Sequence, residues 1–310
     1  MDGIFFLFLA FLTVLASTKL SYYGDILGKQ SKFGSAFVGG ILIAAITSLP
    51  EFVTSISAVV INNPTLSFGD ILGSNMFNIF VLAVYNIYFF RKDVFKNTKR
   101  KYILECLILI FDYIFIVLGS NNIFINIVSF VLFFLYVIYM YSVFKYSEEE
   151  EDDDLNQEKY VIVKFIFTAI ILIFLSILLT IQADNITREY PNFSSSTIGA
   201  ILLGITTSLP EVVTTFALLK LNNFNMAISN MLGSNIFNFL VLSVSDTFIK
   251  QGHIYSYSDM YSRMYVIGGL SITFLFLLTL VFKPKNKLFY FLISIIISII
   301  YLYVWYLQFI

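Results

Sequence analysis

The chain has 310 residues, 58% of them hydrophobic and 18% aromatic, and its mean hydropathy is +0.85. This composition excludes a soluble globular domain, in which about a quarter of the residues are charged. The formal net charge of -1 indicates no nucleic-acid partner, and Cys106, the one cysteine, cannot form an internal disulfide and is expected to be a small buried apolar residue.

Apolar runs of about 20 residues, the length that crosses a bilayer as a helix, recur along the whole chain. The first run, from Ile4 to Ala16, lacks the preceding basic region of a signal peptide, so we expect it to be a spanning helix. The pattern predicts an all-α integral membrane protein. Its ten predicted transmembrane helices are 4–24, 35–61, 68–90, 102–119, 122–144, 160–183, 195–221, 226–248, 263–282 and 288–308.

Basic residues fall mostly on one side of these predicted helices. With both termini outside, about 16 of the 19 Lys and Arg residues lie in cytoplasmic loops, and an error of one helix would remove this bias. We therefore expect a multi-pass protein of the cell membrane with both termini outside.

The acidic run from Glu148 to Asp154 divides the chain into two parts. Like charges repel and no apolar residue invites packing there, so a solvated linker is favoured over a weak regulatory Ca2+ patch. The predicted units are a first five-helix repeat over 1–144, an acidic cytoplasmic linker over 145–159 and a second five-helix repeat over 160–310.

The two parts contain the same motif at a constant offset of 160 residues. Residues 41–80 align without a gap with 201–240, and about 17 of the 40 positions are identical. The identical residues are chiefly polar, whereas packing alone would repeat apolar ones. Because five helices precede the linker and five follow it, corresponding helices cross the membrane in opposite directions. Such inverted repeats are typical of secondary transporters, which bind substrates near the bilayer midplane.

A proline follows Thr-Ser-Leu in each copy of the motif. It lacks an N–H group and clashes with the carbonyl four residues earlier, so each helix is predicted to kink or break. Carbonyls released at membrane depth can bind ions where they line a cavity. The carbonyls expected to be available belong to Ala44, Ile46 and Thr47, and to Gly204, Thr206 and Thr207.

Glu51 and Glu211 carry the strongest functional signal. A carboxylate at membrane depth costs at least a few kcal/mol, and no basic residue in these helices is placed to pair with it. The neighbouring polar side chains offer oxygen, without Cys or His, which suits a hard cation such as Ca2+ or Na+. Residues placed on shared helix faces by four-residue spacing are Thr47 with Glu51, Thr207 with Glu211, Ser74 with Asn78, and Ser234 with Asn238.

The other polar residues divide between candidate ligands and structural roles. Ser48 and Ser208 are candidate ligands that could instead bond to helix carbonyls. Asp70, which aligns with Asn230, is expected to cap the start of a motif helix. Glu105 and Asp112 have no counterparts in the second half, and His253 carries no signal. Residues expected to bridge helices are Asn75 and Asn235, and those expected to form turns are Asn62, Asn63, Asn222 and Asn223.

The paired motifs resemble the α-repeats of the calcium/cation antiporter superfamily, specifically the sodium/calcium exchanger branch in its compact prokaryotic ten-helix form. That family carries G-T-S-L-P-E followed by G-S-N-x-x-N or G-S-N-x-x-D. Here ITSLPE with GSNMFN, and TTSLPE with GSNIFN, stand in those places. The resemblance implies a transporter, not an enzyme, that exchanges Na+ for Ca2+ by alternating access, without a cofactor and as a monomer.

The resemblance also implies a set of ion ligands. For Ca2+ these are Glu51, Glu211 and the carbonyls of Thr47 and Thr207. For Na+ they add Ser48, Ser74, Ser208, Ser234 and the carbonyls of Ala44 and Gly204, while Asn78 and Asn238 complete the centre.

Three positions depart from the family pattern. Ile46 and Thr206 replace the glycine before the motif threonine, and Asn238 stands where the potassium-dependent branch has Asp. The alternative within the class is a proton-coupled antiporter for Ca2+ or another divalent cation, although that branch typically carries Gly-Asn-x-x-Glu motifs. A channel and an intramembrane enzyme with a glutamate acid/base pair are the interpretations from other classes.

Overall fold

The computed structural model describes residues 2–30, 34–92, 94–145, 160–187 and 203–309. These residues form helices and no strands, in agreement with the all-α prediction. Eight of the described helices are long and apolar enough to cross a membrane, and a bent pair, Gly34–Thr47 with Leu49–Val60, makes a ninth if it is counted as one span. The start of the predicted span 195–221 lies outside the described residues. Almost all of the predicted linker lies outside them as well.

The long helices are α1 (Asp2–Gln30), α4 (Leu49–Val60), α5 (Pro64–Tyr88), α7 (Ile103–Ser120), α8 (Ile125–Lys145), α9 (Val161–Thr187), α12 (Leu209–Lys220), α13 (Phe224–Asp246), α14 (Met260–Phe282) and α15 (Lys287–Tyr306). The short elements are α2 (Gly34–Phe37), the π-helix η1 (Val38–Ile43), α3 (Ala44–Thr47), η2 (Phe90–Lys92), α6 (Val94–Asn97), η3 (Arg100–Tyr102), α11 (Gly204–Thr207), η5 (Ile254–Tyr257) and η6 (Leu307–Phe309).

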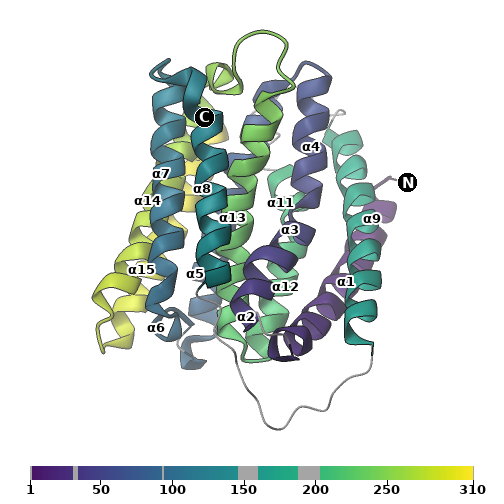
Figure 1. Ribbon diagram of the computed structural model, residues 1–310, viewed down its shortest axis with the longest axis vertical. Helices are drawn as coiled ribbons and strands as arrows, with labels where there is room; N and C mark the ends of the chain where they lie inside the picture. The colour runs from purple at the N-terminus through teal and green to yellow at the C-terminus, as the bar shows by residue number, and fades with distance from the viewer. Residues whose placement is uncertain (1, 31–33, 93, 146–159, 188–202, 310) are drawn as a thin grey trace.

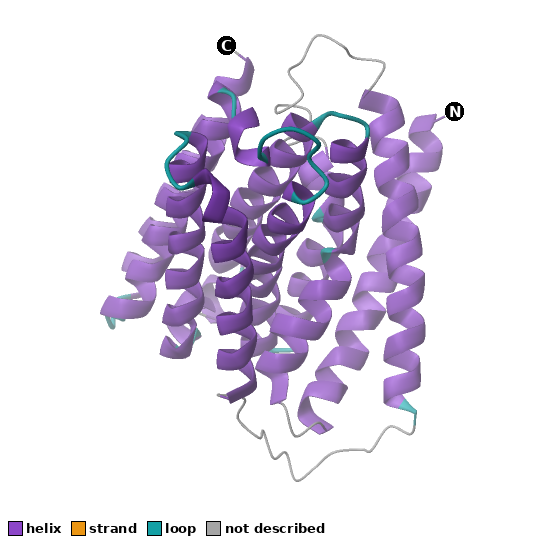
Figure 2. Cartoon of the chain, turned by 45° about the horizontal axis from the view of Figure 1, so that its top comes forward, coloured by secondary structure: helices purple, strands orange, loops and turns teal. Residues whose placement is uncertain are grey.

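Helices α5 and α13 form the centre of the bundle (Figure 1). Most of their residues are buried, whereas only 28% of the residues are buried in the apolar stretches of α1, α8, α9 and α15, as expected of helices that face lipid. The N-terminal end of α1 and the C-terminal end of α15 lie at the same end of the bundle (Figure 2). The polar residues of the motif helices are therefore enclosed by other helices rather than facing outward.

Two glycines allow η1 to approach α13 closely. A Cβ atom added to Gly233 would collide with the carbonyl oxygen of Gly40, so the two backbones meet directly. The hydroxyl of Tyr139 on α8 donates to the same carbonyl at 2.7 Å. The wide turn of a π-helix often marks a functional segment, and here it holds the start of α3 against the centre of the bundle.

The predicted asparagine turns are confirmed. Asn62 and Asn222 adopt left-handed conformations, with φ of 61° and 63°, which asparagine tolerates better than most residues. The next residue in each turn caps the following helix: Asn63 accepts from the backbone N–H of Leu66 at 3.3 Å, and Asn223 makes the equivalent bond at 3.0 Å. These turns reverse the chain directly between α4 and α5 and between α12 and α13.

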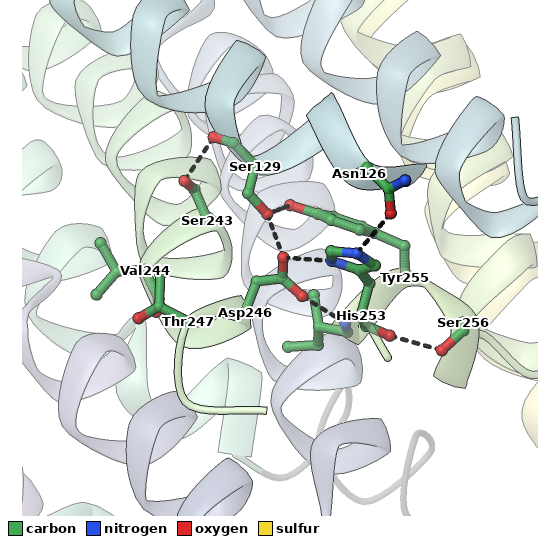
Figure 3. Close-up of polar contacts among 10 residues, drawn as sticks. Asn126, Ser129, Ser243, Val244, Asp246, Thr247, His253, Tyr255 and Ser256 are labelled. Atoms are coloured by element: carbon green, nitrogen blue, oxygen red, sulfur yellow. Dashed lines mark hydrogen bonds and ion pairs between the residues drawn. The ribbon is translucent and has the colours of Figure 1, made fainter. Parts of the chain in front are cut away.

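A polar network fixes the loop after α13, as Figure 3 shows. Asp246 accepts from the backbone N–H of Ile254 at 2.7 Å and from the hydroxyl of Ser129 on α8 at 2.6 Å. The ring nitrogens of His253 lie 3.0 Å from Asp246 Oδ2 and 3.0 Å from Asn126 Oδ1. The sequence indicated no role for His253, but its contact with Asn126 joins this loop to α8.

Replacing the carboxylate of this network should destabilise the protein. Asp246→Ala leaves Ser129 and the Ile254 N–H without their acceptor, and losing hydrogen bonds to a charged group costs about 2 kcal/mol. We expect the midpoint temperature of unfolding to fall. It is measured by heating the detergent-solubilised protein and following its folded fraction by size-exclusion chromatography. Thr247→Ala is the control, because that exposed hydroxyl bonds only to its own helix at Val244. Equal midpoints for the two variants would contradict this role.

Candidate ion-binding site

Both motif helices are interrupted directly before their prolines. Ser48 separates α3 from α4 with φ −89° and ψ 6°, and Ser208 separates α11 from α12 with φ −77° and ψ 1°. Pro50 and Pro210 then occupy the first turn of the following helix, where a missing N–H has no cost. Every boundary of the second pair lies 160 residues after its counterpart, so both motif copies fold in the same way.

The carbonyls of Ala44 and Gly204 are less free than the sequence suggested. Each accepts the backbone N–H of the serine at the break, at 3.0 Å for Ser48 and 3.3 Å for Ser208. Each also accepts from a hydroxyl, Gly204 from Ser74 at 3.2 Å and Ala44 from Thr47 at 3.3 Å, so an ion bound by either carbonyl would have to replace that hydroxyl. Proline therefore leaves the two backbone bonds in place.

The carboxylates of Glu51 and Glu211 are fully buried and are bonded across the two halves. Ser208 Oγ donates to Glu51 Oε1 at 3.1 Å, and Ser48 Oγ donates to Glu211 Oε1 at 2.8 Å. The second oxygen of each carboxylate has no hydrogen-bond partner among the described residues. Each half thus supplies the hydroxyl for the carboxylate of the other half, rather than for its own helix carbonyls.

The threonines of the motif lie at the same place. Their hydroxyls donate to the carbonyl four residues earlier, at 3.0 Å for Thr47 and 2.9 Å for Thr207. They also approach a carboxylate, but it is that of the opposite half: Thr47 approaches Glu211, and Thr207 approaches Glu51. The four-residue spacing within one helix therefore missed the pairing that the fold creates between helices.

Four asparagines join α5 to α13 in a reciprocal network. The side-chain N–H groups of Asn75 and Asn235 donate to each other's backbone carbonyl, at 3.1 and 2.9 Å. Asn78 donates to Asn235 Oδ1, and Asn238 donates to Asn75 Oδ1, both at 2.9 Å. The predicted bridging role of Asn75 and Asn235 is confirmed. Because the amide nitrogens of Asn78 and Asn238 are engaged, their oxygens are left as unpartnered buried acceptors.

The result is a buried cluster in which acceptors outnumber donors. Such a cluster is costly without a cation, because buried polar atoms lacking partners lose their hydration. Carboxylate, amide and hydroxyl oxygens suit Ca2+ or Na+. Within the described residues no group of three His, Cys, Asp or Glu side chains could hold a metal ion, so two carboxylates and neutral oxygens make this site. The unpartnered atoms are Glu51 Oε2, Glu211 Oε2, Asn78 Oδ1, Asn238 Oδ1 and Ser234 Oγ.

The predicted helix cap at Asp70 is wrong. Helix α5 begins at Pro64 and is capped by Asn63, so Asp70 lies well inside it, fully buried. Its Oδ1 is 3.4 Å from the hydroxyl of Thr207 in the other half. The sequence did carry a signal for this position, because Asp70 precedes Ser74 and Asn78 at intervals of four and therefore shares their helix face.

The remaining buried acids belong to α7. Glu105 and Asp112 are buried, and Cys106 between them is fully buried, as the sequence predicted. Neither oxygen of Asp112 has a hydrogen-bond partner among the described residues. No bond links either acid to the two motif glutamates among the described contacts, so both serve as comparison residues for the site.

Comparisons with known proteins give a family match and a shared fold. The family model described as Sodium/calcium exchanger protein matches residues 3–145 and 160–310. Inner membrane protein YrbG of Escherichia coli is 26% identical over 275 residues, 83% of each chain. Membrane protein MJ0091 of Methanocaldococcus jannaschii is 29% identical over 233 residues, 70% of this chain and 74% of its own. A structure of the sodium-calcium exchanger NCX_Mj soaked with Na+ and Sr2+ superposes with a TM-score of 0.74 at 21% identity over 98% of both chains, which shows a common fold.

Removing one bridging amide should weaken cation binding. Asn75→Ala takes away the acceptor of Asn238 and the donor to Asn235, so the amide oxygen of Asn238 loses its orientation. Loss of such an outer partner costs about 10-fold or more in metal affinity. The measurement is the Ca2+ concentration that gives half of the maximal thermal stabilisation of purified protein.

The matched control for this test is Asn86→Ala. Asn86 is a buried amide near the C-terminal end of α5, where it bonds to Ser294 and to the backbone of Phe95. Its removal should lower the midpoint temperature of unfolding without altering the Ca2+ concentration that gives half of the maximal thermal stabilisation. A similar Ca2+ response in both variants would show that the asparagine network does not orient cation ligands.

Proposed function

This chain belongs to the sodium/calcium exchanger family, and from that premise we propose that it exchanges Na+ for Ca2+ across the membrane by alternating access. The observation that carries the proposal is the pair of buried glutamates. Each accepts a hydrogen bond from a serine of the other half, and each has one oxygen without a partner among the described residues. A hard cation would satisfy both oxygens at once. NCX_Mj, whose fold this chain shares, is a sodium-calcium exchanger.

Competition for one pair of carboxylates couples the two ions. Two carboxylates neutralise one Ca2+ ion, and Na+ ions offer an alternative neutral state. With no ion bound, two negative charges would remain at membrane depth, which is the most costly state. We propose that the protein therefore changes its accessible side only when loaded. The full proposed ligand set is Glu51, Glu211, Thr47, Thr207, Ser48, Ser208, Ser74, Ser234, Asn78, Asn238, Ala44 and Gly204.

Inverted repeats would provide the two accessible states. We propose two five-helix halves, 1–144 and 160–310, joined by the linker 145–159, with ten spanning helices in all. Figure 1 supports opposite orientations, because α4 lies above α3 while α12 lies below α11. Movement of one half against the other would open the site to either side in turn. The protein would work as a monomer with both termini outside, with Ca2+ and Na+ as substrates and no cofactor.

Neutralising either central glutamate should abolish exchange. We expect Glu51→Gln and Glu211→Gln to reduce Na+-gradient-driven Ca2+ uptake into proteoliposomes at least 100-fold, because an amide cannot neutralise Ca2+. Glu105→Gln is the matched control, since it removes a buried glutamate of α7 outside the cluster, and it should keep its flux. Wild-type flux in both central variants would refute the site.

The coupling ion can be tested in the same vesicles. Uptake that follows an outward Na+ gradient at equal pH on both sides supports Na+ exchange. Uptake that ignores Na+ and follows a pH gradient would support the proton-coupled alternative instead. Flux without any counter-ion would indicate a channel.

The proposed orientation predicts which loops meet the outside. In a Cys106→Ser background, a cysteine at Asn121, in the exposed turn between α7 and α8, should react with a membrane-impermeant maleimide in intact cells. A cysteine at Lys96, on α6 at the opposite end of the bundle, should react only after the membrane is permeabilised. The reverse labelling pattern would invert the assigned topology.

A further inference from the structure

Asp70 breaks the symmetry of the two motif helices. It aligns with Asn230 at the offset of 160 residues, so a carboxylate in the first half replaces a neutral amide in the second. Both side chains are fully buried, at 0% exposure. The chain thus contains a third buried carboxylate on the motif helices, 3.4 Å from the hydroxyl of the motif residue Thr207.

The two side chains also point to different partners. Asn230 donates to the hydroxyl of Thr215 in its own half, at 3.0 Å. The residue aligned with Thr215 is Ser55, whose hydroxyl has no partner among the described residues, so Asp70 does not make the equivalent bond. Asp70 instead lies 3.4 Å from Thr207, across the boundary between the halves. The carboxylate therefore approaches a residue of the other half, whereas the amide nitrogen of Asn230 bonds within its own half and its amide oxygen has no partner among the described residues.

Among the described residues Asp70 has one hydrogen-bond donor, the hydroxyl of Thr207, and it shares that donor with a backbone carbonyl. The hydroxyl of Thr207 has one hydrogen atom, and the carbonyl of Leu203, at 2.9 Å, is a closer acceptor than Asp70. The second oxygen of Asp70 has no partner at all among the described residues. A buried carboxylate without a basic partner or a full set of donors is stabilised by a proton or by a bound cation, and a cation requires further oxygen ligands nearby.

Neutral oxygens surround this carboxylate on the same side. Ser74, one turn further along α5, donates to the carbonyl of Gly204 at 3.2 Å and lies 3.5 Å from the hydroxyl of Thr207. Asp70, Ser74, Thr207 and Gly204 therefore offer carboxylate, hydroxyl and carbonyl oxygens together. Such a set suits a hard cation rather than a transition metal.

We propose that Asp70 is an additional Na+ ligand, which makes the Ser74–Gly204 side of the site anionic and binds Na+ more tightly than the equivalent side of the other half. The proposal rests on the proposed exchange of Na+ for Ca2+. In that exchange Glu51 and Glu211 neutralise the charge of Ca2+, so the charge of Asp70 is left for a monovalent ion. The amide of Asn230 gives the other half no such charge.

Asp70→Asn tests the proposal with the residue that the other half itself uses. The Na+ concentration for half-maximal Na+-driven Ca2+ release from proteoliposomes should rise about tenfold, because one anionic ligand becomes neutral. The Na+ concentration that half-stabilises the purified protein against heating should rise in parallel. Exchange of Ca2+ for Ca2+ without Na+ should stay within about twofold of wild type, because Glu51 and Glu211 remain. Asp112→Asn, the same change at a buried position of α7, should alter none of these values.

Several results would overturn the role of Asp70. An unchanged Na+ requirement in Asp70→Asn would exclude it as a Na+ ligand. Loss of Ca2+/Ca2+ exchange together with the Na+ response would assign Asp70 to the Ca2+ site. A change only in the pH dependence of exchange would show that Asp70 binds a proton instead of Na+. Absence of Na+-driven Ca2+ flux in the wild type would refute the proposed function. The Na+ dependence of thermal stability would still decide whether Asp70 is a Na+ ligand. If Asp70→Asn does not fold, Asp70→Ser carries the same test.

Discussion

The structure depends on the burial of Glu51 and Glu211 at membrane depth. Each carboxylate accepts from one hydroxyl at about 3 Å, and its second oxygen has no hydrogen-bond partner among the described residues, none of which compensates the charge. A basic partner would compensate it permanently and would remove the need for a cation. The incomplete satisfaction of these two groups therefore makes a reversible ion site reasonable, and the surrounding packing must supply the energy that this arrangement costs.

Reciprocal bonding between the halves gives the site its dependence on both of them. Ser48 and Ser208 each donate to the glutamate of the opposite half, and Asn75 and Asn235 each orient an amide of the opposite half. Displacing one half would break several of these bonds together. Ion occupancy and the relative position of the halves are thus linked through the same atoms, which is the physical basis that coupled transport requires.

Local features of the site could be read from the sequence, and contacts between helices could not. The breaks before Pro50 and Pro210 and the asparagine turns follow from backbone chemistry, which acts within a few residues. The cross-pairing of Ser48 with Glu211 depends on how the break between α3 and α4 packs against α12, and spacing within one helix carries no such information. For Asp70, the helix start was placed too late in the sequence, so a buried position two turns inside α5 was assigned to a cap.

The distribution of charge separates the centre of the site from its flank. At the centre the two halves match: one glutamate and one inward asparagine from each, with Asn238 opposite Asn78. An ion held there would meet nearly the same ligands from either half, so the centre alone would not favour one accessible side. On the flank, Asp70 faces the boundary between the halves whereas Asn230 faces its own half. A preference for one direction of access would have to arise from such asymmetric positions around the site, because the symmetric ones cannot supply it.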